Sequence, residues 1–95
     1  MGIEYKFYKR QEVSCREEPP EGGLLYLEAE NKAFVLNNTG LLVWKTITGE
    51  MDPREIAAAV HSRFEDVDFD TVLNDVSEYI DVLYNKGFLM LVEYE

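Results

Sequence analysis

The segment at residues 34–55 constrains the fold more than any other part of the chain, because local signals follow one another there with almost no spare loop. Residues 34–36 (F-V-L) are apolar and β-prone, and the next four residues (N-N-T-G) supply turn and N-cap chemistry. Apolar residues then recur at helical spacing, at Leu41, Leu42, Trp44 and Ile47. Gly49 ends this helix, and D-P-R-E at residues 52–55 opens the next one with an N-cap, a first-turn proline and a capping-box glutamate.

A strand that leads directly into two short capped helices indicates a winged helix-turn-helix. Strands are expected at residues 3–8, 24–28, 32–36 and 88–92. Helices are expected at residues 39–48, 53–64 and 68–86. Helix 53–64 is expected to bury Ile56, Ala57, Val60 and Phe64, and helix 68–86 to bury Val72, Leu73, Val76, Ile80 and Leu83. The last helix starts near Asp68 or Asp70, and Gly87 suits a left-handed C′ position. We predict an α+β fold: an N-terminal antiparallel sheet of two to three strands, three helices and a C-terminal wing strand.

Composition sets independent limits on the kind of protein. A chain of 95 residues fits one domain, and 46% hydrophobic residues can form a modest core. The formal net charge of −10 opposes binding to nucleic acid or anionic lipid. Cys15 is the only cysteine, so no intramolecular disulfide can form, and we expect a cytoplasmic location. Nothing at the N-terminus resembles a signal peptide, and no run of about 18 apolar residues predicts a membrane span.

The sequence contains no set of residues that suggests catalysis, a metal or another cofactor. His61 has no second histidine or cysteine at ligand spacing, and Cys15 has no base near it in sequence. The acidic run at residues 65–70 lacks the central glycine and final glutamate of a calcium-binding loop, and is better explained as a solvated loop that caps the following helix. We therefore expect a protein that is not an enzyme.

Two surfaces carry more apolar residues than a self-contained core requires. The hairpin at residues 24–36 is apolar at consecutive positions, whereas a sheet with one solvated face alternates. Its second face could be covered by the N-terminal strand, by a second copy in a homodimer, or by a bound peptide. The last helix has a flanking stripe of Asp75, Tyr79, Val82 and Lys86, which is either the edge of a broad core face or one wall of a groove against residues 32–36.

The chain resembles the PqqD-like family, also called RiPP recognition elements. The resemblance depends on the order and spacing of L-N-x-T-G at residues 36–40, Trp44, Gly49, Glu55-Ile56, Asp75-Val76 and L-x-x-x-G-F-L at residues 83–89. It covers about residues 22–92 of a single domain spanning 1–95, and leaves residues 1–21 as an N-terminal extension that either adds a strand or docks on a partner. The resemblance implies a peptide chaperone, which holds the leader segment of a ribosomally made precursor peptide and presents it to a modifying enzyme such as a radical-SAM protein.

The resemblance also implies where the peptide would lie, between the strand at residues 32–36 and the last helix. Carried over by position, the peptide-binding residues are Ala33, Phe34, Val35, Asp75, Tyr79 and Val82. A register slip of one residue would reverse which of the three strand side chains face the peptide.

Two other functions are compatible with the same sequence. A winged helix could belong to a DNA-binding regulator, but residues 50–95 carry twelve acidic residues against three basic ones. The expected last helix offers Asp75, Glu78 and Asp81, whereas phosphates and base edges require arginine and lysine. A purely structural or dimerisation subunit would use the same apolar sheet face without a peptide ligand. We expect a non-catalytic peptide-binding adaptor.

Overall fold

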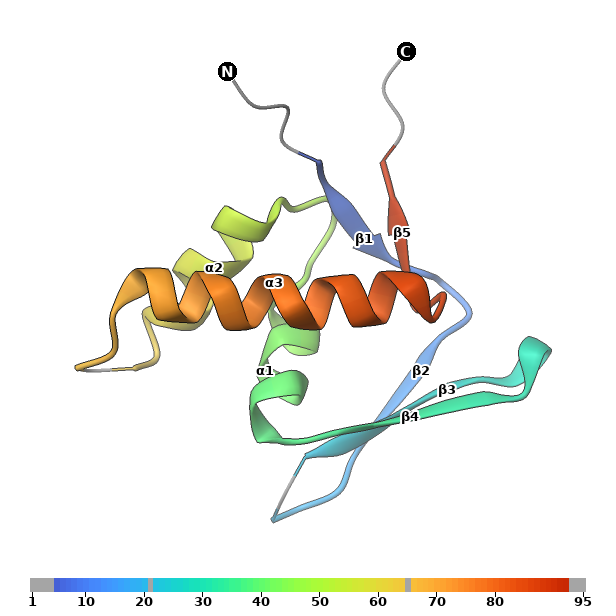
Figure 1. Ribbon diagram of the computed structural model, residues 1–95. Coiled ribbons are helices and arrows are strands. Elements are labelled where there is room, and N and C mark those ends of the chain that lie inside the picture. The colour runs from blue at the N-terminus through green and yellow to red at the C-terminus, as the bar shows by residue number, and fades with distance from the viewer. Residues whose placement is uncertain (1–4, 21, 65, 93–95) are drawn as a thin grey trace.

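The computed structural model describes residues 5–20, 22–64 and 66–92 of the chain (Figure 1). The described residues form an α+β fold with three helices, as the sequence predicts, and with two antiparallel sheets, one sheet more than the sequence predicts. The elements in chain order are β1 (Phe7–Lys9), β2 (Ser14–Glu17), β3 (Gly23–Leu27), a 3-10 turn (Glu28–Glu30), β4 (Lys32–Leu36), α1 (Asn38–Thr46), α2 (Pro53–His61), α3 (Phe69–Asn85) and β5 (Leu89–Leu91). None of these helices is long and apolar enough to cross a membrane.

The N-terminal extension contributes a strand to each sheet. β2 pairs with β3, which pairs with β4, so the larger sheet has the order β2-β3-β4. β1 pairs with β5, and the two strands lie side by side near both ends of the chain in Figure 1. Phe7 also exchanges backbone hydrogen bonds of 2.8 and 3.0 Å with Met51, which ties the segment before α2 to β1. The C-terminal strand is confirmed, and its partner is the extension.

Side-chain caps fix the starts of the first two helices, as their sequences predict. The side-chain oxygen of Asn37 accepts a hydrogen bond from the backbone N–H of Gly40 at 2.8 Å. At α2 the capping box is complete: Asp52 accepts from the N–H of Glu55 at 2.8 Å, and Glu55 accepts from the N–H of Asp52 at 2.9 Å. These bonds satisfy N–H groups that have no partner within the helix.

A glycine turn ends α3 and directs the chain into β5. Gly87 has φ +89°, the left-handed conformation expected from the sequence. Its N–H donates to the carbonyl of Tyr84 at 3.0 Å, and the N–H of Phe88 donates to the carbonyl of Leu83 at 2.9 Å, which is the Schellman pattern. Leu83 and Phe88 are both buried, so the turn also closes a hydrophobic contact beneath the end of the helix.

The core lies between the inner face of the larger sheet and the three helices. It is formed by Leu25, Leu27, Leu36, Val43, Trp44, Ile47, Ile56, Ala57, Val60, Val72, Val76, Ile80, Leu83, Phe88 and Leu89. Phe64 does not join this core, contrary to the sequence prediction, because α2 ends at His61 and the helical period no longer places Phe64 on the inward face. Leu73 is only partly buried and packs against the edge of the core.

Trp44 is the one aromatic residue of α1 and only 3% exposed, so we expect Trp44→Ala to destabilise the fold by about 3 to 5 kcal/mol. This is a large part of the stability of an ordinary small domain. Urea unfolding followed by far-UV circular dichroism measures the change. Lys45→Ala is the matched control, since Lys45 is exposed and its ion pair with Glu17 contributes at most about 1 kcal/mol. Normal stability of Trp44→Ala would contradict the core assignment.

Candidate functional site

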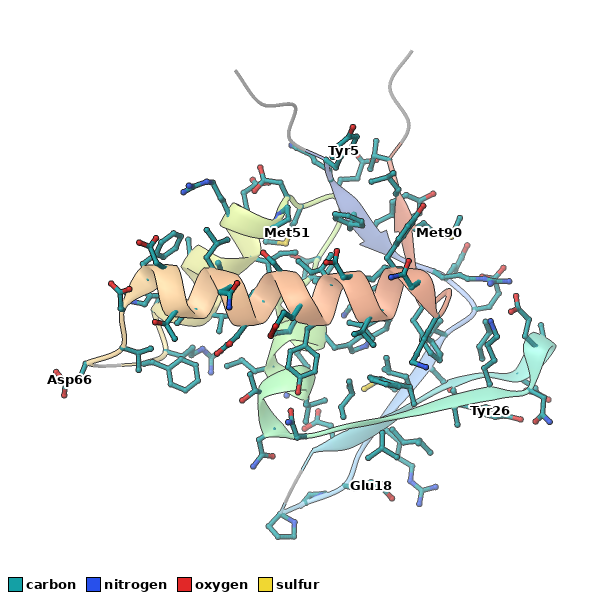
Figure 2. All side chains as sticks on the ribbon, viewed as in Figure 1. Tyr5, Glu18, Tyr26, Met51, Asp66 and Met90 are labelled. Atoms are coloured by element: carbon teal, nitrogen blue, oxygen red, sulfur yellow. The ribbon has the colours of Figure 1, made fainter. Side chains whose placement is uncertain are left out.

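A groove of about 380 Å³ lies between β4 and α3, where Figure 2 shows side chains from the two elements facing one another. β4 and the start of α1 provide one wall, and α3 provides the other. The groove is lined by Phe34, Asn37, Thr39, Asp75, Glu78, Tyr79 and Val82. Its volume is within the range of about 300 to 1,000 Å³ that is common for ligand sites.

β4 is an edge strand over the described part of the chain. It pairs only with β3, in the register Gly23↔Leu36 to Leu27↔Lys32. Among the described residues, no backbone hydrogen bond outside this ladder involves β4. The free side of β4 therefore presents backbone N–H and C=O groups that another extended chain can bind.

Four of the six predicted site residues line this groove, and two do not. Phe34, Asp75, Tyr79 and Val82 meet there. Alternation along β4 turns Phe34 toward α3, where its ring lies 6.2 Å from that of Phe88, and turns Ala33 and Val35 to the opposite face of the sheet. Val35 is accordingly 75% exposed. Side chains of Ala33 and Val35 cannot contact a ligand held against α3, although their backbone groups belong to the same strand.

Tyr79 is fixed in the groove by the segment that follows β4. Its hydroxyl donates a hydrogen bond to the side-chain oxygen of Asn37, the same oxygen that caps α1. Its ring lies against Gly40, where an added Cβ would stand only 2.7 Å from the Cε1 atom of Tyr79. The N-N-T-G segment therefore positions a groove residue as well as starting a helix. The sequence pattern assigns Asn37 and Thr39 only N-cap roles, so it misses their place in the groove.

The two ends of the groove carry opposite charges. The carboxylates of Asp75 and Glu78 are exposed at the end near the start of α1. At the other end, Lys32 Nζ donates to the carbonyl of Lys86 at 3.2 Å, and Lys86 Nζ lies 5.7 Å from the centroid of the Phe34 ring. The carbonyl at the end of a helix carries partial negative charge, so the contact of Lys32 with Lys86 is favourable. It joins β4 to α3 and bounds the groove.

Beside this end, Glu30 pairs with Arg10 at 2.7 Å and with Lys32 at 3.1 Å. Hydrogen bonds from Arg10, and then from Lys32, lower the pKa of Glu30 below its ordinary value. All of these groups are solvated, so the cluster contributes little to stability. Its effect is to hold the Lys32 side chain beside the end of α3.

The described residues include no cluster of three or more His, Cys, Asp and Glu side chains that could hold a metal ion. His61 Nε2 instead forms a 2.7 Å hydrogen bond to the carbonyl of Val67. Cys15 is an exposed residue of β2, but its pairing with Leu25 turns the thiol toward the inner side of the sheet. Partial burial there, opposed by the charge of Lys9, raises the pKa of the Cys15 thiol. This is the opposite of what an activated nucleophile requires.

Comparison with known proteins identifies the family of this chain. The family model described as coenzyme PQQ synthesis protein D (PqqD) matches residues 21–89, and the chain belongs to this family. The solved structure of TbiB1 in complex with the TbiA(beta) leader peptide is similar with a TM-score of 0.72, at 23% sequence identity over 93% of this chain and 98% of that one.

A lasso peptide synthetase B1 complexed with the leader peptide is similar with a TM-score of 0.67, at 20% identity over 88% of this chain and 96% of that one. At these identities the likeness establishes the fold. The chain has no significant match among curated proteins.

The contact between Gly40 and Tyr79 leads to a test by double-mutant cycle. We expect Gly40→Ala to destabilise the wild-type protein by about 1 to 3 kcal/mol, because the new methyl group overlaps the Tyr79 ring. In the Tyr79→Ala background the same change should cost much less, since the ring is gone and the remaining close atom, Leu36 Cδ2 at 3.2 Å from the added Cβ, belongs to a side chain that can move. Urea unfolding of the four proteins gives the coupling energy. Additive effects, within about 0.5 kcal/mol, would show that the ring does not depend on Gly40.

Proposed function

We propose that this protein is a non-catalytic adaptor that captures the leader segment of a ribosomally synthesised precursor peptide. The observation that carries the proposal is the groove between the free edge of β4 and α3, which combines unpaired backbone groups with an apolar wall. An extended peptide added to β4 would satisfy the backbone groups, and every second side chain would point into the groove. Affinity then comes from main-chain hydrogen bonds and selectivity from the groove.

The groove residues define the chemistry of the peptide. Tyr79 and Val82 offer apolar surface, and the 38% exposure of Val82 leaves it free to contact a ligand. Asp75 and Glu78 place two carboxylates on the same side of α3. The peptide should present an apolar side chain to Tyr79 and Val82, and a lysine or arginine to the carboxylates, where a partly exposed ion pair contributes about 0 to 1 kcal/mol.

An adaptor of this kind delivers the peptide to a second protein. We propose that this second protein is a peptide-modifying enzyme such as a radical-SAM protein. The similar solved structures are both complexes with leader peptides, which supports a peptide as the groove's occupant. Precursor peptides are released by ribosomes in the cytoplasm, so we propose a cytoplasmic location for the adaptor. We also propose that residues 1–95 form a single domain. The raised pKa of Cys15 and the lone hydrogen-bonded His61 support a role in binding without chemistry.

Two other functions use the same fold. A DNA-binding regulator would need cations on α3, but Phe69–Asn85 has none, and its exposed residues include Asp75, Glu78 and Asp81. A dimerisation subunit would use the outer face of the larger sheet, where the exposed Val35 lies beside Leu24. That face does not involve the groove, so a homodimer formed through it is compatible with peptide binding.

We expect Val82→Asp to weaken peptide binding at least tenfold, about 1.4 kcal/mol, because an unpaired carboxylate would have to lose its water in the groove. The measurement is fluorescence anisotropy with a labelled linear peptide selected against the wild-type protein from a random library. Tyr84→Asp is the matched control: Tyr84 is 42% exposed and stands two residues further along α3, on the other flank of the helix. Equal binding by Val82→Asp and the wild type would contradict the groove.

Asp75→Asn should reduce peptide affinity less than Val82→Asp does, and should make the affinity less dependent on salt concentration, since it removes one charge from a solvated pair.

Chemical-shift mapping of the wild-type protein with the same peptide locates the site directly. We expect shifts along β4 and α3. Shifts confined to residues 53–64, or to residues 88–92, would rule out this site.

The adaptor proposal also predicts that the protein does not retain duplex DNA. A net charge of −10 and an acidic α3 oppose the phosphate contacts on which nonspecific binding depends. An electrophoretic shift assay with random duplex at micromolar protein and physiological ionic strength is sufficient. Salt-sensitive retention of the duplex would favour the regulator instead.

A further inference from the structure

A second, smaller pocket adjoins the groove on the side of the start of α3. It has a volume of about 170 Å³ and lies between α2, α3 and the loop that joins them, which contains the labelled Asp66 in Figure 2. Its apolar lining consists of Val60, Phe64, Val67, Val72 and Val76. Thr39 and Asp75 line both this pocket and the groove, so the two spaces share a rim.

His61 forms hydrogen bonds with the backbone of both Phe64 and Val67. The Nε2 atom of His61 forms a 2.7 Å hydrogen bond to the carbonyl of Val67, and its ring meets the ring of Phe69 edge-on at 5.7 Å. The N–H of Phe64 donates to the carbonyl of His61 at 3.0 Å. Phe64 and Val67 nevertheless remain 41% and 37% exposed, so two apolar side chains of the pocket are left uncovered.

The size of the pocket indicates what fills it. At about 170 Å³ it is smaller than the roughly 300 Å³ at which pockets for whole small molecules begin. It can hold one apolar side chain. The groove is bounded at its other end by the contact of Lys32 with Lys86, whereas at Thr39 and Asp75 it shares its lining with the pocket. A chain that lies along β4 therefore reaches the pocket by extending past Thr39.

We propose that this pocket receives a second apolar side chain of the same peptide, two residues from the one that contacts Tyr79 and Val82. This inference rests on the proposed function. The α3 residues that line the pocket precede those that line the groove by about one helical turn, roughly 6 Å at 1.5 Å per residue. Two residues of an extended strand span about the same length, and side chains two apart point to the same face. The recognition element is therefore a pair of apolar residues separated by one residue.

Selection from a random linear peptide library tests the pocket and does not require the natural peptide. Peptides selected on the wild-type protein should share two apolar positions with one residue between them. Peptides selected on the double variant Phe64→Ala/Val67→Ser should retain only one of these positions. The control is Tyr84→Ala/Met90→Ala, which removes two similarly exposed apolar side chains from other faces and should leave both positions selected. A single apolar position on the wild type, or an unchanged pair on the double variant, overturns the proposal.

Affinity measurements separate this pocket from the groove itself. In the wild type, changing the pocket-directed residue of a selected peptide to alanine should weaken binding about tenfold, and in Phe64→Ala/Val67→Ser it should have no effect. If the double variant does not fold, Val67→Asn alone serves the same comparison. An equal loss in wild type and variant would refute the pocket while leaving the adaptor function standing. If the wild type selects no peptide at all, both the pocket and the adaptor function are wrong.

Discussion

The hydrogen bond from Tyr79 to Asn37 is the interaction on which the geometry of the site depends. Asn37 directly follows β4, and its side-chain oxygen caps α1. The same oxygen accepts a hydrogen bond from the hydroxyl of Tyr79 in the middle of α3, so it joins three elements. The absence of a Cβ at Gly40 lets the Tyr79 ring approach closely. Because the strand and the helix are joined at this point, the space between them has a defined width. A groove with a defined width can select side chains. In a mobile groove, part of the binding free energy would be spent on ordering the groove residues, and the affinity would be lower.

The opposite end of α3 is fixed by other means, and the two fixed ends explain why the space between them stays open. Gly87 turns the chain so that Phe88 is buried beneath the helix, and Lys32 reaches from β4 to the last carbonyl groups. Between these points β4 contributes only the Phe34 side chain to the groove. Leu36 is buried in the core, Lys32 reaches the end of α3, and Ala33 and Val35 point to the outer face of the sheet. One partly buried ring does not fill the gap between a strand and a helix. Apolar surface is left in contact with water, which is typical of binding sites.

The features that the sequence predicts correctly are those that depend on residues close together in the chain. The capping box at Asp52, the Asn37 cap, the Gly87 turn and the hairpin each depend on residues a few positions apart, and all are confirmed. Features that depend on pairing between distant segments were not predictable. The exposed, charged strand β2 has no apolar pattern and exists because β3 offers it an edge. The face on which Ala33 and Val35 lie is decided by register, which no local signal fixes. The second pocket needs Phe64 to leave α2, and helical periodicity predicts the reverse.

The charge of the protein bears on a hazard that comes with an open β4. A free strand edge can pair with the same edge of another copy, which leads to aggregation. Here such a pairing would bring two copies of α3 close together, each with Asp75 and Glu78 beside the edge and a net charge of −10 on each chain. Over distances within the Debye length of about 8 Å at physiological ionic strength, these carboxylates repel one another. The same carboxylates attract a peptide that carries lysine or arginine. The acidic α3 thus disfavours self-pairing and favours a basic ligand at one edge, so the strand can remain open without a permanent cover.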